Sequence, residues 1–247
     1  MKKLLAVLLF VPLFAWAQEY TLDHAPDLSN DQSALQNGAK LFVNYCLNCH
    51  NASSMRYSKL EALGLTEDQV KKNLLFTSDK IGDLMKVAMQ AKDAKEWFGA
   101  APPDLSVIAR AKASERGSGP DYIYTYLRTY YPDPTRPTGW NNLAYPNSAM
   151  PHILWELQGM QVPVYVEKKG EDGKAEEAFD HFEEVKAGKL TKLQYDQSVA
   201  ELTAFLTWMA EPAQDLRHRV GVWVLLFLAV TFVLVWQLNA TYWKEVK

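Results

Sequence analysis

The two cysteines of the chain lie three residues apart, and a histidine follows the second one directly, so that Cys46, Cys49 and His50 form the motif CLNCH. C-x-x-C-H is the sequence at which c-type haem is attached to a polypeptide. Residues three apart share one face of a helical turn, so both sulfurs can form thioethers with the two vinyl groups of a porphyrin. The next side chain, His50, is then placed to bind the iron as its proximal ligand. The motif predicts one covalently bound haem c.

Two other uses of paired thiols fit these residues less well. A redox-active disulfide of the thioredoxin type normally follows a strand in a βαβ unit, whereas the segment before Cys46 has the periodicity of a helix. A closed zinc site needs four ligands, and the sequence has no second cluster of cysteine and histidine. The remaining histidines occur singly, at His24, His152, His181 and His218. Haem attachment is the interpretation that we adopt.

The sixth ligand of the iron decides what such a haem does. Methionine opposite histidine gives an electron carrier of raised potential, whereas an open position suits peroxidase chemistry or gas binding. Met150 stands in the sequence AYPNSAMPH, in which Pro146 and Pro151 restrict the backbone, and we favour it as the distal ligand. Met160 is the next choice. His152 is a competitor that could equally be an ordinary loop histidine.

Four other methionines fit the role of distal ligand less well. Met55 lies five residues after His50, which is too near to reach the opposite face of the haem easily. Met85 and Met89 are four residues apart in the stretch IGDLMKVAMQAK, which we expect to be an amphipathic helix. Met209 belongs to the apolar stripe of another expected helix. Methionines in such stripes usually fill gaps in a core.

Two helices are expected to hold the haem motif. Ser29 or Asn30 can cap a helix that runs to about Tyr45. One side of this helix carries Leu35, Gly38, Leu41, Phe42 and Tyr45. A second helix is expected from Thr191 to Ala210, ended by Pro212. Its apolar stripe comprises Tyr195, Val199, Leu202, Phe205, Leu206 and Met209. Because glycine has no side chain, we expect this second helix to cross the first closely at Gly38.

Both ends of the chain carry membrane-related signals. Residues 1–17, MKKLLAVLLFVPLFAWA, have the lysines, the apolar run and the small residues of a secretory signal peptide. Residues 220–239 contain no charged side chain, and as a helix they would span about 30 Å, which is close to the thickness of a hydrocarbon core. We therefore expect residues 18–219 to face the periplasm, 220–239 to anchor the chain in the inner membrane, and 240–247 to form a cytoplasmic tail. The leader lacks the arginine-rich and serine-rich composition of a mitochondrial import sequence, which indicates a bacterial protein.

The composition limits the remaining possibilities. The roughly 200 residues between leader and anchor are enough for one domain with a real core. The formal charge is -3, and it becomes -5 when Lys2 and Lys3 leave with the signal peptide. This mild acidity argues against a nucleic-acid partner and leaves room for a basic protein partner.

Six segments of the chain resemble the cytochrome c1 family of proteobacteria, the haem subunits of ubiquinol:cytochrome c reductase. They are FVNYCLNCH (42–50), MRYSKL (55–60), APPDLSVIARAK (101–112), DYIYTYLRTYYPDP (121–134), AMPHILWELQG (149–159) and EPAQDLRHRVG (211–221). The resemblance extends over essentially the whole chain. It implies a mainly α fold: a cytochrome c-type haem domain with loop insertions plus one C-terminal transmembrane helix.

The same resemblance implies a function in the cytochrome bc1 complex. The chain would take one electron from the Rieske iron-sulfur protein and pass it to cytochrome c, while its anchor contacts cytochrome b and membrane lipid in a dimeric complex. It would perform no substrate chemistry of its own, so it is an enzyme only as part of the complex. The alternative within the same class is a membrane-anchored cytochrome c subunit of a terminal oxidase.

For individual residues, the resemblance implies Cys46 and Cys49 as thioether sites and His50 and Met150 as axial ligands. It places Arg110 near a haem propionate, and the alternative for this residue is an ordinary surface arginine. Pro102, Pro103 and Tyr126 are expected to line the haem crevice. Residues 167–184 hold eight acidic side chains against three lysines, with Gly170 and Gly173 marking a turn. We expect either a solvated loop or, by family analogy, an acidic surface that steers a basic cytochrome c.

Overall fold

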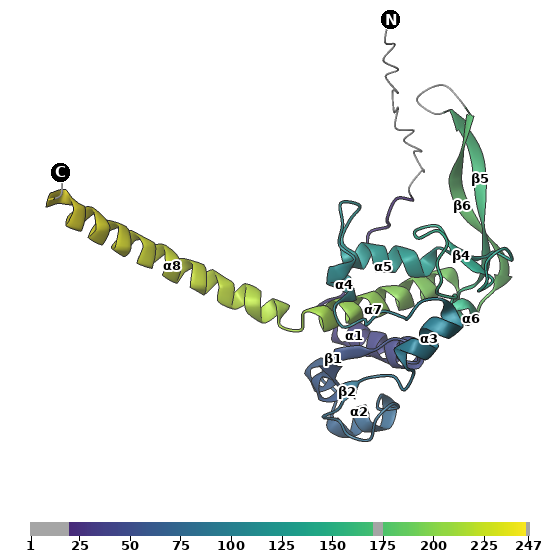
Figure 1. Ribbon diagram of the computed structural model, residues 1–247, viewed down its shortest axis with the longest axis horizontal. Coiled ribbons are helices and arrows are strands. Elements are labelled where there is room, and N and C mark those ends of the chain that lie inside the picture. Colours follow the sequence, from purple (N-terminus) through teal and green to yellow (C-terminus); the bar gives the residue numbers. More distant parts are fainter. Residues whose placement is uncertain (1–19, 170–174, 246–247) are drawn as a thin grey trace, which may run out of the picture.

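The computed structural model describes residues 20–169 and 175–245, and the signal peptide expected at residues 1–17 lies outside this part (Figure 1). The helices are α1 (Gln32–Leu41), α2 (Glu67–Asn73), α3 (Ala91–Phe98), α4 (Ile108–Ala111), α5 (Gly119–Arg128), α6 (Trp155–Gln158), α7 (Lys192–Ala210) and α8 (Gln214–Tyr242). The strands are β1 (Ala52–Arg56), β2 (Leu84–Met85), β3 (Tyr130–Pro132), β4 (Trp140–Asn142), β5 (Gly159–Lys169) and β6 (Ala175–Ala187). Helices dominate, as the sequence predicts.

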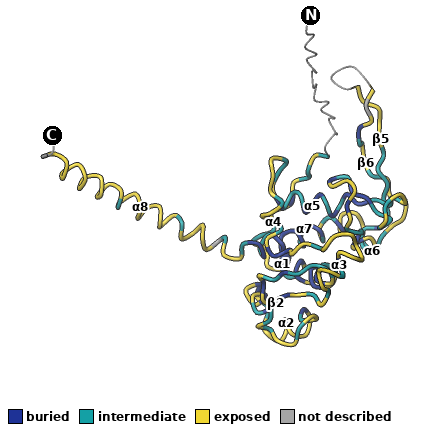
Figure 2. The backbone as a smooth tube through the Cα atoms, viewed as in Figure 1, coloured by how far each residue is buried: buried dark blue, intermediate teal, exposed yellow. Residues whose placement is uncertain are grey.

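The core of the body forms where α1 crosses α7, and the buried residues gather along these helices and α5 (Figure 2). The predicted close crossing at Gly38 is confirmed. A Cβ atom on Gly38 would lie 2.2 Å from the main-chain oxygen of Glu201 and 2.6 Å from the Cβ of Phe205. The predicted stripe of α7 is buried throughout, and the range of the helix agrees with the prediction, with Thr191 as its N-cap. Only glycine allows the two backbones to approach this closely.

The start and the end of α1 differ in detail from the prediction. The capping residue is Asp31 instead of Ser29 or Asn30, because its carboxylate accepts hydrogen bonds from the main-chain nitrogens of Ser33 at 2.9 Å and Ala34 at 3.0 Å. After Leu41 the helical path continues as one wider π-helical turn over Phe42–Cys46. This turn delivers the chain directly into the cysteine motif.

Helix α5 is fixed between α7 and the segment that precedes α1. Its first turn is closed by a reciprocal pair of hydrogen bonds between Ser118 and Asp121. Its last residue, Arg128, bonds to Asp196 of α7 at 2.6 Å and to Asp23 at 2.7 Å. These partly buried charge-assisted bonds hold three distant segments of the chain together.

The prediction of a helix over IGDLMKVAMQAK (81–92) is wrong. Met85 lies in the short strand β2 and pairs with Ala52 of β1, and α3 begins only at Ala91. The intervening chain is held by a long-range contact, since the main-chain nitrogen of Val87 donates to the side-chain oxygen of Asn51 at 2.8 Å. Pairing with the segment after the haem motif thus overrides the local helical pattern.

The acidic segment is a hairpin and not the expected loop. Strands β5 and β6 pair antiparallel over 159–169 and 175–187, and the hairpin projects from the body (Figure 1). Phe179 stands opposite Tyr165, Phe182 stands opposite Pro163, and the rings of Phe179 and Phe182 lie 5.0 Å apart, so aromatic contacts stabilise the pair. Val162, Val164 and Val166 alternate along β5, as β-branched residues often do in strands. The turn expected at Gly170 and Gly173 lies outside the described residues.

Helix α8 extends away from the body and is exposed along its length (Figures 1 and 2). Residues Leu216–Tyr242 are long enough and apolar enough to cross a membrane. The anchor predicted at 220–239 lies within them. An apolar helix of about 40 Å that the described part of the chain leaves exposed needs a bilayer or partner helices around it.

Candidate haem site

The cysteine motif folds as one helical turn. The main-chain oxygen of Cys46 accepts hydrogen bonds from the nitrogens of Cys49 at 3.1 Å and His50 at 2.8 Å. Leu47, between the cysteines, is fully buried and anchors the turn in the core. Both cysteines are free thiols and remain partly exposed. The turn therefore presents two thiols and an imidazole within five residues.

The imidazole of His50 is oriented by Pro103, which lies 53 residues further along the chain. Its Nδ1 lies 2.7 Å from the main-chain oxygen of Pro103. Because a carbonyl oxygen only accepts, Nδ1 carries the proton in this bond and Nε2 keeps the lone pair that binds a metal. Burial lowers the pKa of His50, while the bond to Pro103 and the charge of Asp104 oppose the shift. The ring is thus neutral and ready to act as a ligand at pH 7.

A second layer of contacts holds Pro103 in place. The carboxylate of Asp104 accepts hydrogen bonds from the main-chain nitrogens of Ser53 at 2.9 Å and Ser106 at 2.8 Å. The nitrogen of Leu105 donates to the oxygen of Asn51 at 2.8 Å. Burial alone would raise the pKa of Asp104, but the bonds from the two serines outweigh it and lower the pKa. The segment APPDLS is therefore fastened to the residues directly after the haem motif.

The protonation of the two thiols argues against the alternative uses of the motif. Burial and the neighbouring Cys49 raise the pKa of Cys46 to about 12, and burial raises the pKa of Cys49 as well. Redox-active C-x-x-C pairs have instead a thiol of lowered pKa that serves as the nucleophile. Among residues 20–169 and 175–245, no group of three or more His, Cys, Asp and Glu side chains is arranged to hold a metal ion.

Met150 lies in the loop between β4 and α6 and is partly exposed. The hydroxyl of Tyr130 donates to its main-chain oxygen at 3.1 Å. The other favoured methionine, Met160, lies at the beginning of β5 and pairs with Lys186.

The remaining methionines divide into core residues and one partly exposed residue. Met55, Met85 and Met209 are part of the hydrophobic core, and each is less than 5% exposed. Met89 is partly exposed, between β2 and α3. Met150 as the iron ligand stays a prediction, and its partly exposed position in a loop is compatible with it.

His152, the competing ligand, is a buried residue, 2% exposed. Its ring stacks on Tyr130 at a centroid distance of 4.7 Å and meets the edge of Trp140 at 5.2 Å. Neither ring nitrogen has a hydrogen-bond partner among the residues that the structure describes. Burial lowers the pKa of His152 to about 4. The ring is therefore neutral, and it packs between Tyr130 and Trp140 two residues after Met150 in the same loop.

The other predicted crevice residues have different surroundings. Arg110 is exposed on α4, and its position beside a haem propionate stays a prediction. The hydroxyl of Tyr126 forms a hydrogen bond of 2.7 Å with that of Ser148, which precedes Met150 by two residues. The sequence did not single out Ser148, Tyr130 or the carbonyl of Pro103. For the carbonyl of Pro103, the one hint in the sequence was the segment APPDLS, in which two prolines are followed by an aspartate.

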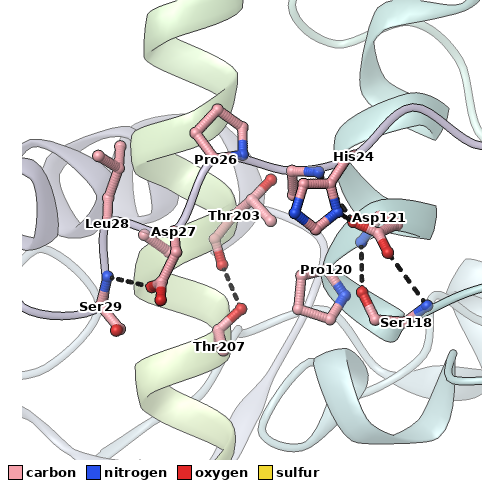
Figure 3. Close-up of a pocket in the computed structure, with 12 residues that line it drawn as sticks. His24, Pro26, Asp27, Leu28, Ser29, Ser118, Pro120, Asp121, Thr203 and Thr207 are labelled. Atoms are coloured by element: carbon pink, nitrogen blue, oxygen red, sulfur yellow. Dashed lines mark hydrogen bonds and ion pairs between the residues drawn. The ribbon is translucent and has the colours of Figure 1, made fainter.

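The donor set fits a haem c. Two protonated thiols on one turn supply thioether sites, a neutral imidazole with a free Nε2 supplies the proximal ligand, and a loop methionine can supply the distal one. By contrast, the cavity of about 270 Å³ in Figure 3 is bordered by residues 24–29, the first turn of α5 and part of α7. None of the predicted site residues lines it. At its rim the Nδ1 of His24 lies 3.1 Å from a carboxylate oxygen of Asp121.

Comparison with known proteins gives a consistent result. The model of the cytochrome C1 family matches residues 24–246. Cytochrome c1 of Allochromatium vinosum is 44% identical over 87% of this chain and 86% of its own length. Cytochrome c1 of Rhodospirillum rubrum is 32% identical over 88% of this chain and 83% of its own length. A protein of Nitrosomonas europaea called ammonia monooxygenase gamma subunit is 42% identical over 99% of this chain and 98% of its own length.

Cytochrome c1 proteins carry a covalently bound haem c, transfer electrons, and are subunits of the bc1 complex together with cytochrome b and the Rieske protein. The apolar helix α8 agrees with the membrane attachment of such a subunit. The family match covers the haem motif, both core helices and the anchor. The chain therefore belongs to the cytochrome c1 family, and its cofactor is haem c.

Proposed function

We propose that this chain accepts one electron from the reduced Rieske iron-sulfur protein and passes it to a cytochrome c on the periplasmic side of the inner membrane. The observation that carries the proposal is the bond between His50 and Pro103, at 2.7 Å, directly behind two free thiols. It fixes the tautomer in which Nε2 can bind iron. Haem c supplies the one-electron chemistry when it is bound.

The residues of this chain hold and tune that group. Cys46 and Cys49 attach it covalently, so it is not lost between turnovers. The Nδ1 proton that His50 shares with Pro103 raises the basicity of the ligating nitrogen, and a thioether from Met150 favours the reduced state. An exposed guanidinium such as that of Arg110 would favour the reduced state further if it lies near a propionate. Electron transfer needs no acid, base or nucleophile in this chain. The oxidation of quinol, which also releases protons, belongs to cytochrome b in this proposal.

The proposed topology follows from the two ends of the chain. A signal peptide at 1–17 directs export, residues 18–219 form the periplasmic domain, 220–239 cross the membrane, and 240–247 remain in the cytoplasm. The uniformly exposed apolar surface of α8 supports this arrangement, because it needs lipid and the helices of cytochrome b around it. A dimeric complex is part of the same proposal.

The projecting hairpin is the proposed guide for the electron acceptor. Its described acidic residues Glu167, Glu177, Asp180, Glu183 and Glu184 are all exposed. Glu167 stands directly opposite Glu177 in the register of the two strands. Lys168, Lys169 and Lys186 lie on the same two strands, so the described part of the hairpin carries more acidic than basic side chains but is not uniformly acidic. Such a surface attracts a basic cytochrome c and raises its association rate at low ionic strength.

Purification of the native complex in mild detergent tests the proposal. We expect cytochrome b and a Rieske protein to copurify with the chain, and quinol to reduce its haem. Copurification of copper-haem oxidase subunits instead would establish the alternative of an oxidase subunit. The name of the Nitrosomonas europaea relative suggests a third partner, an ammonia monooxygenase, and the same preparation decides whether such subunits accompany this chain.

A further inference from the structure

Three tyrosines follow one face of α5 toward the Met150 loop. Tyr122 and Tyr126 stack at a centroid distance of 5.8 Å, and Tyr126 meets the edge of Tyr130 at 5.1 Å. Tyr130 comes just after the helix, at the beginning of β3, and its side chain is fully buried. The last hydroxyl of this row therefore lies in the interior beside the loop.

The hydroxyls of these residues converge on the main chain of Met150. Tyr130 bonds to the hydroxyl of Tyr126 and donates to the main-chain oxygen of Met150 at 3.1 Å. Tyr126 bonds to the Oγ of Ser148 at 2.7 Å, and this Oγ also lies 3.4 Å from the Tyr130 hydroxyl. A carbonyl oxygen only accepts, so the bond to Met150 uses the one hydroxyl proton of Tyr130. The hydroxyl of Tyr126 can then donate to that of Tyr130, and the hydroxyl of Ser148 can donate to that of Tyr126.

The rest of the loop is held by buried amides. The side chain of Asn142 donates to the main-chain oxygen of Tyr126 at 2.7 Å, and that of Asn141 accepts from the nitrogen of Asn147 at 2.8 Å. Asn147 adopts a positive φ of 64°, a conformation that asparagine tolerates better than most residues. The loop is thus fixed before Ser148. At Met150 itself the main-chain oxygen accepts from the hydroxyl of Tyr130 at 3.1 Å and, over the longer distance of 3.5 Å, from the Oγ of Ser148.

We propose that Tyr130 is a positioning residue for Met150, whose hydroxyl holds the main chain of the loop and thereby strengthens the bond between the methionine sulfur and the iron. This inference rests on the proposed role of Met150 as distal ligand. Opening of the loop that would withdraw the methionine from the iron would also break the hydrogen bond from Tyr130 to the main-chain oxygen of Met150. Removing the hydroxyl therefore makes opening about fivefold easier, the factor that one ordinary net hydrogen bond contributes to an equilibrium constant.

The test measures the binding of imidazole to the ferric haem of the purified complex, because imidazole competes with Met150 for the iron. In Tyr130→Phe the ring still packs on His152, and we expect about fivefold tighter imidazole binding with the haem still attached. Tyr195→Phe is the matched control. Tyr195 is equally buried and donates to the main-chain oxygen of Leu127 at 2.7 Å, away from the loop. It loses the same kind of bond and should leave the imidazole affinity unchanged.

Met150→Leu is measured in parallel, so that a wrong ligand can be told from a wrong positioning residue. If Met150→Leu leaves the imidazole affinity unchanged, the ligand assignment and this inference both fall. If it tightens binding strongly while Tyr130→Phe behaves like Tyr195→Phe, only the positioning role of Tyr130 falls. Ser148→Ala serves where Tyr130→Phe does not assemble: a smaller change in the same direction supports the network, and no change overturns it.

Discussion

The two sides of the proposed haem site are built in different ways. On the proximal side, the thiols and the imidazole come from five consecutive residues on one turn, and the helix before them delivers this turn into the core. On the distal side, Met150 lies one hundred residues further along and depends on side chains from α5, β3 and β4 for its position. A local motif thus supplies the proximal ligand, which one distant carbonyl, that of Pro103, then orients, whereas the position of Met150 depends on tertiary contacts throughout.

Removing the local motif should have the largest effect. In the double variant Cys46→Ala, Cys49→Ala we expect complete loss of covalently retained haem, because no thiol remains to form a thioether. Haem staining of a denaturing gel measures this directly. Cys46→Ala alone keeps one thiol and should retain stainable haem. Full staining of the double variant would show that the attachment site lies elsewhere.

Changing the distal ligand should leave the haem attached and change its properties. In Met150→Leu we expect the reduction potential to fall by an amount on the order of 0.1 V, because axial ligands tune haem potentials over a range of about 0.8 V. The ferrous protein should also bind carbon monoxide. A redox titration of the purified complex gives the potential, and Met160→Leu is the control. If Met160→Leu gives these changes and Met150→Leu does not, the distal ligand is Met160.

The proximal side also has long-range requirements, namely the bond between His50 and Pro103 and the crossing of α1 and α7 at Gly38. Gly38→Ala would place a methyl group 2.2 Å from the oxygen of Glu201. We expect a loss of about 1–3 kcal/mol in the free energy of unfolding, which corresponds to a fall in Tm of roughly 3–10 °C. Thermal unfolding followed by circular dichroism measures the change.

The control for this crossing is Gly82→Ala, at an exposed position with nothing within 4 Å of the added methyl group. Its Tm should stay within about 2 °C of the unchanged protein, since a surface substitution costs at most about 0.5 kcal/mol. Equal melting of the two variants would mean that α7 shifts freely to accommodate a methyl group at the crossing, so that the crossing does not constrain the proximal side.

Sequence patterns predicted the parts of the molecule that repeat with a local period. The stripe of α7, the range of this helix and the glycine at the crossing are all readable from spacing, because helix packing depends on residues three and four apart. The attachment motif is equally local. The error at the start of α1 is one or two residues in size, since Ser29, Asn30 and Asp31 all have side chains that can cap a helix.

The larger errors occur where distant segments decide the structure. Met85 and Met89 have helical spacing, yet the chain there is extended because Met85 pairs with Ala52, thirty-three residues earlier. The acidic segment was predicted to be a loop from its charge, although the alternating valines of β5 indicate a strand. The partner of Met150, Tyr130, could not be predicted either, because the bond between them depends on how β3 and the loop fold back on α5.

The smallest expected effect concerns a carboxylate that supports the distal loop. Asp133 accepts hydrogen bonds from Thr135 at 2.6 Å and from Asn141 at 2.9 Å, and these bonds lower its pKa from 3.8 to about 2. A lowered pKa stabilises the fold above pH 3.8, and this contribution is lost as the pH falls toward 2. Asp133→Asn should therefore lower the Tm modestly at pH 7 and pH 5, and the difference from the unchanged protein should shrink at pH 3.

The proximal counterpart is Asp104, whose pKa is also lowered, by hydrogen bonds from Ser106 and Ser53 that outweigh its burial. Asp104→Asn should show the same sign of pH dependence, because its stabilising contribution is likewise present above pH 3.8 and lost below it. The two variants differ in which ligand they loosen: Asp133→Asn should tighten imidazole binding slightly through Asn141, whereas Asp104→Asn should not. Equal imidazole binding in both, measured at pH 7, would show that Asn141 holds the Met150 loop without help from the carboxylate.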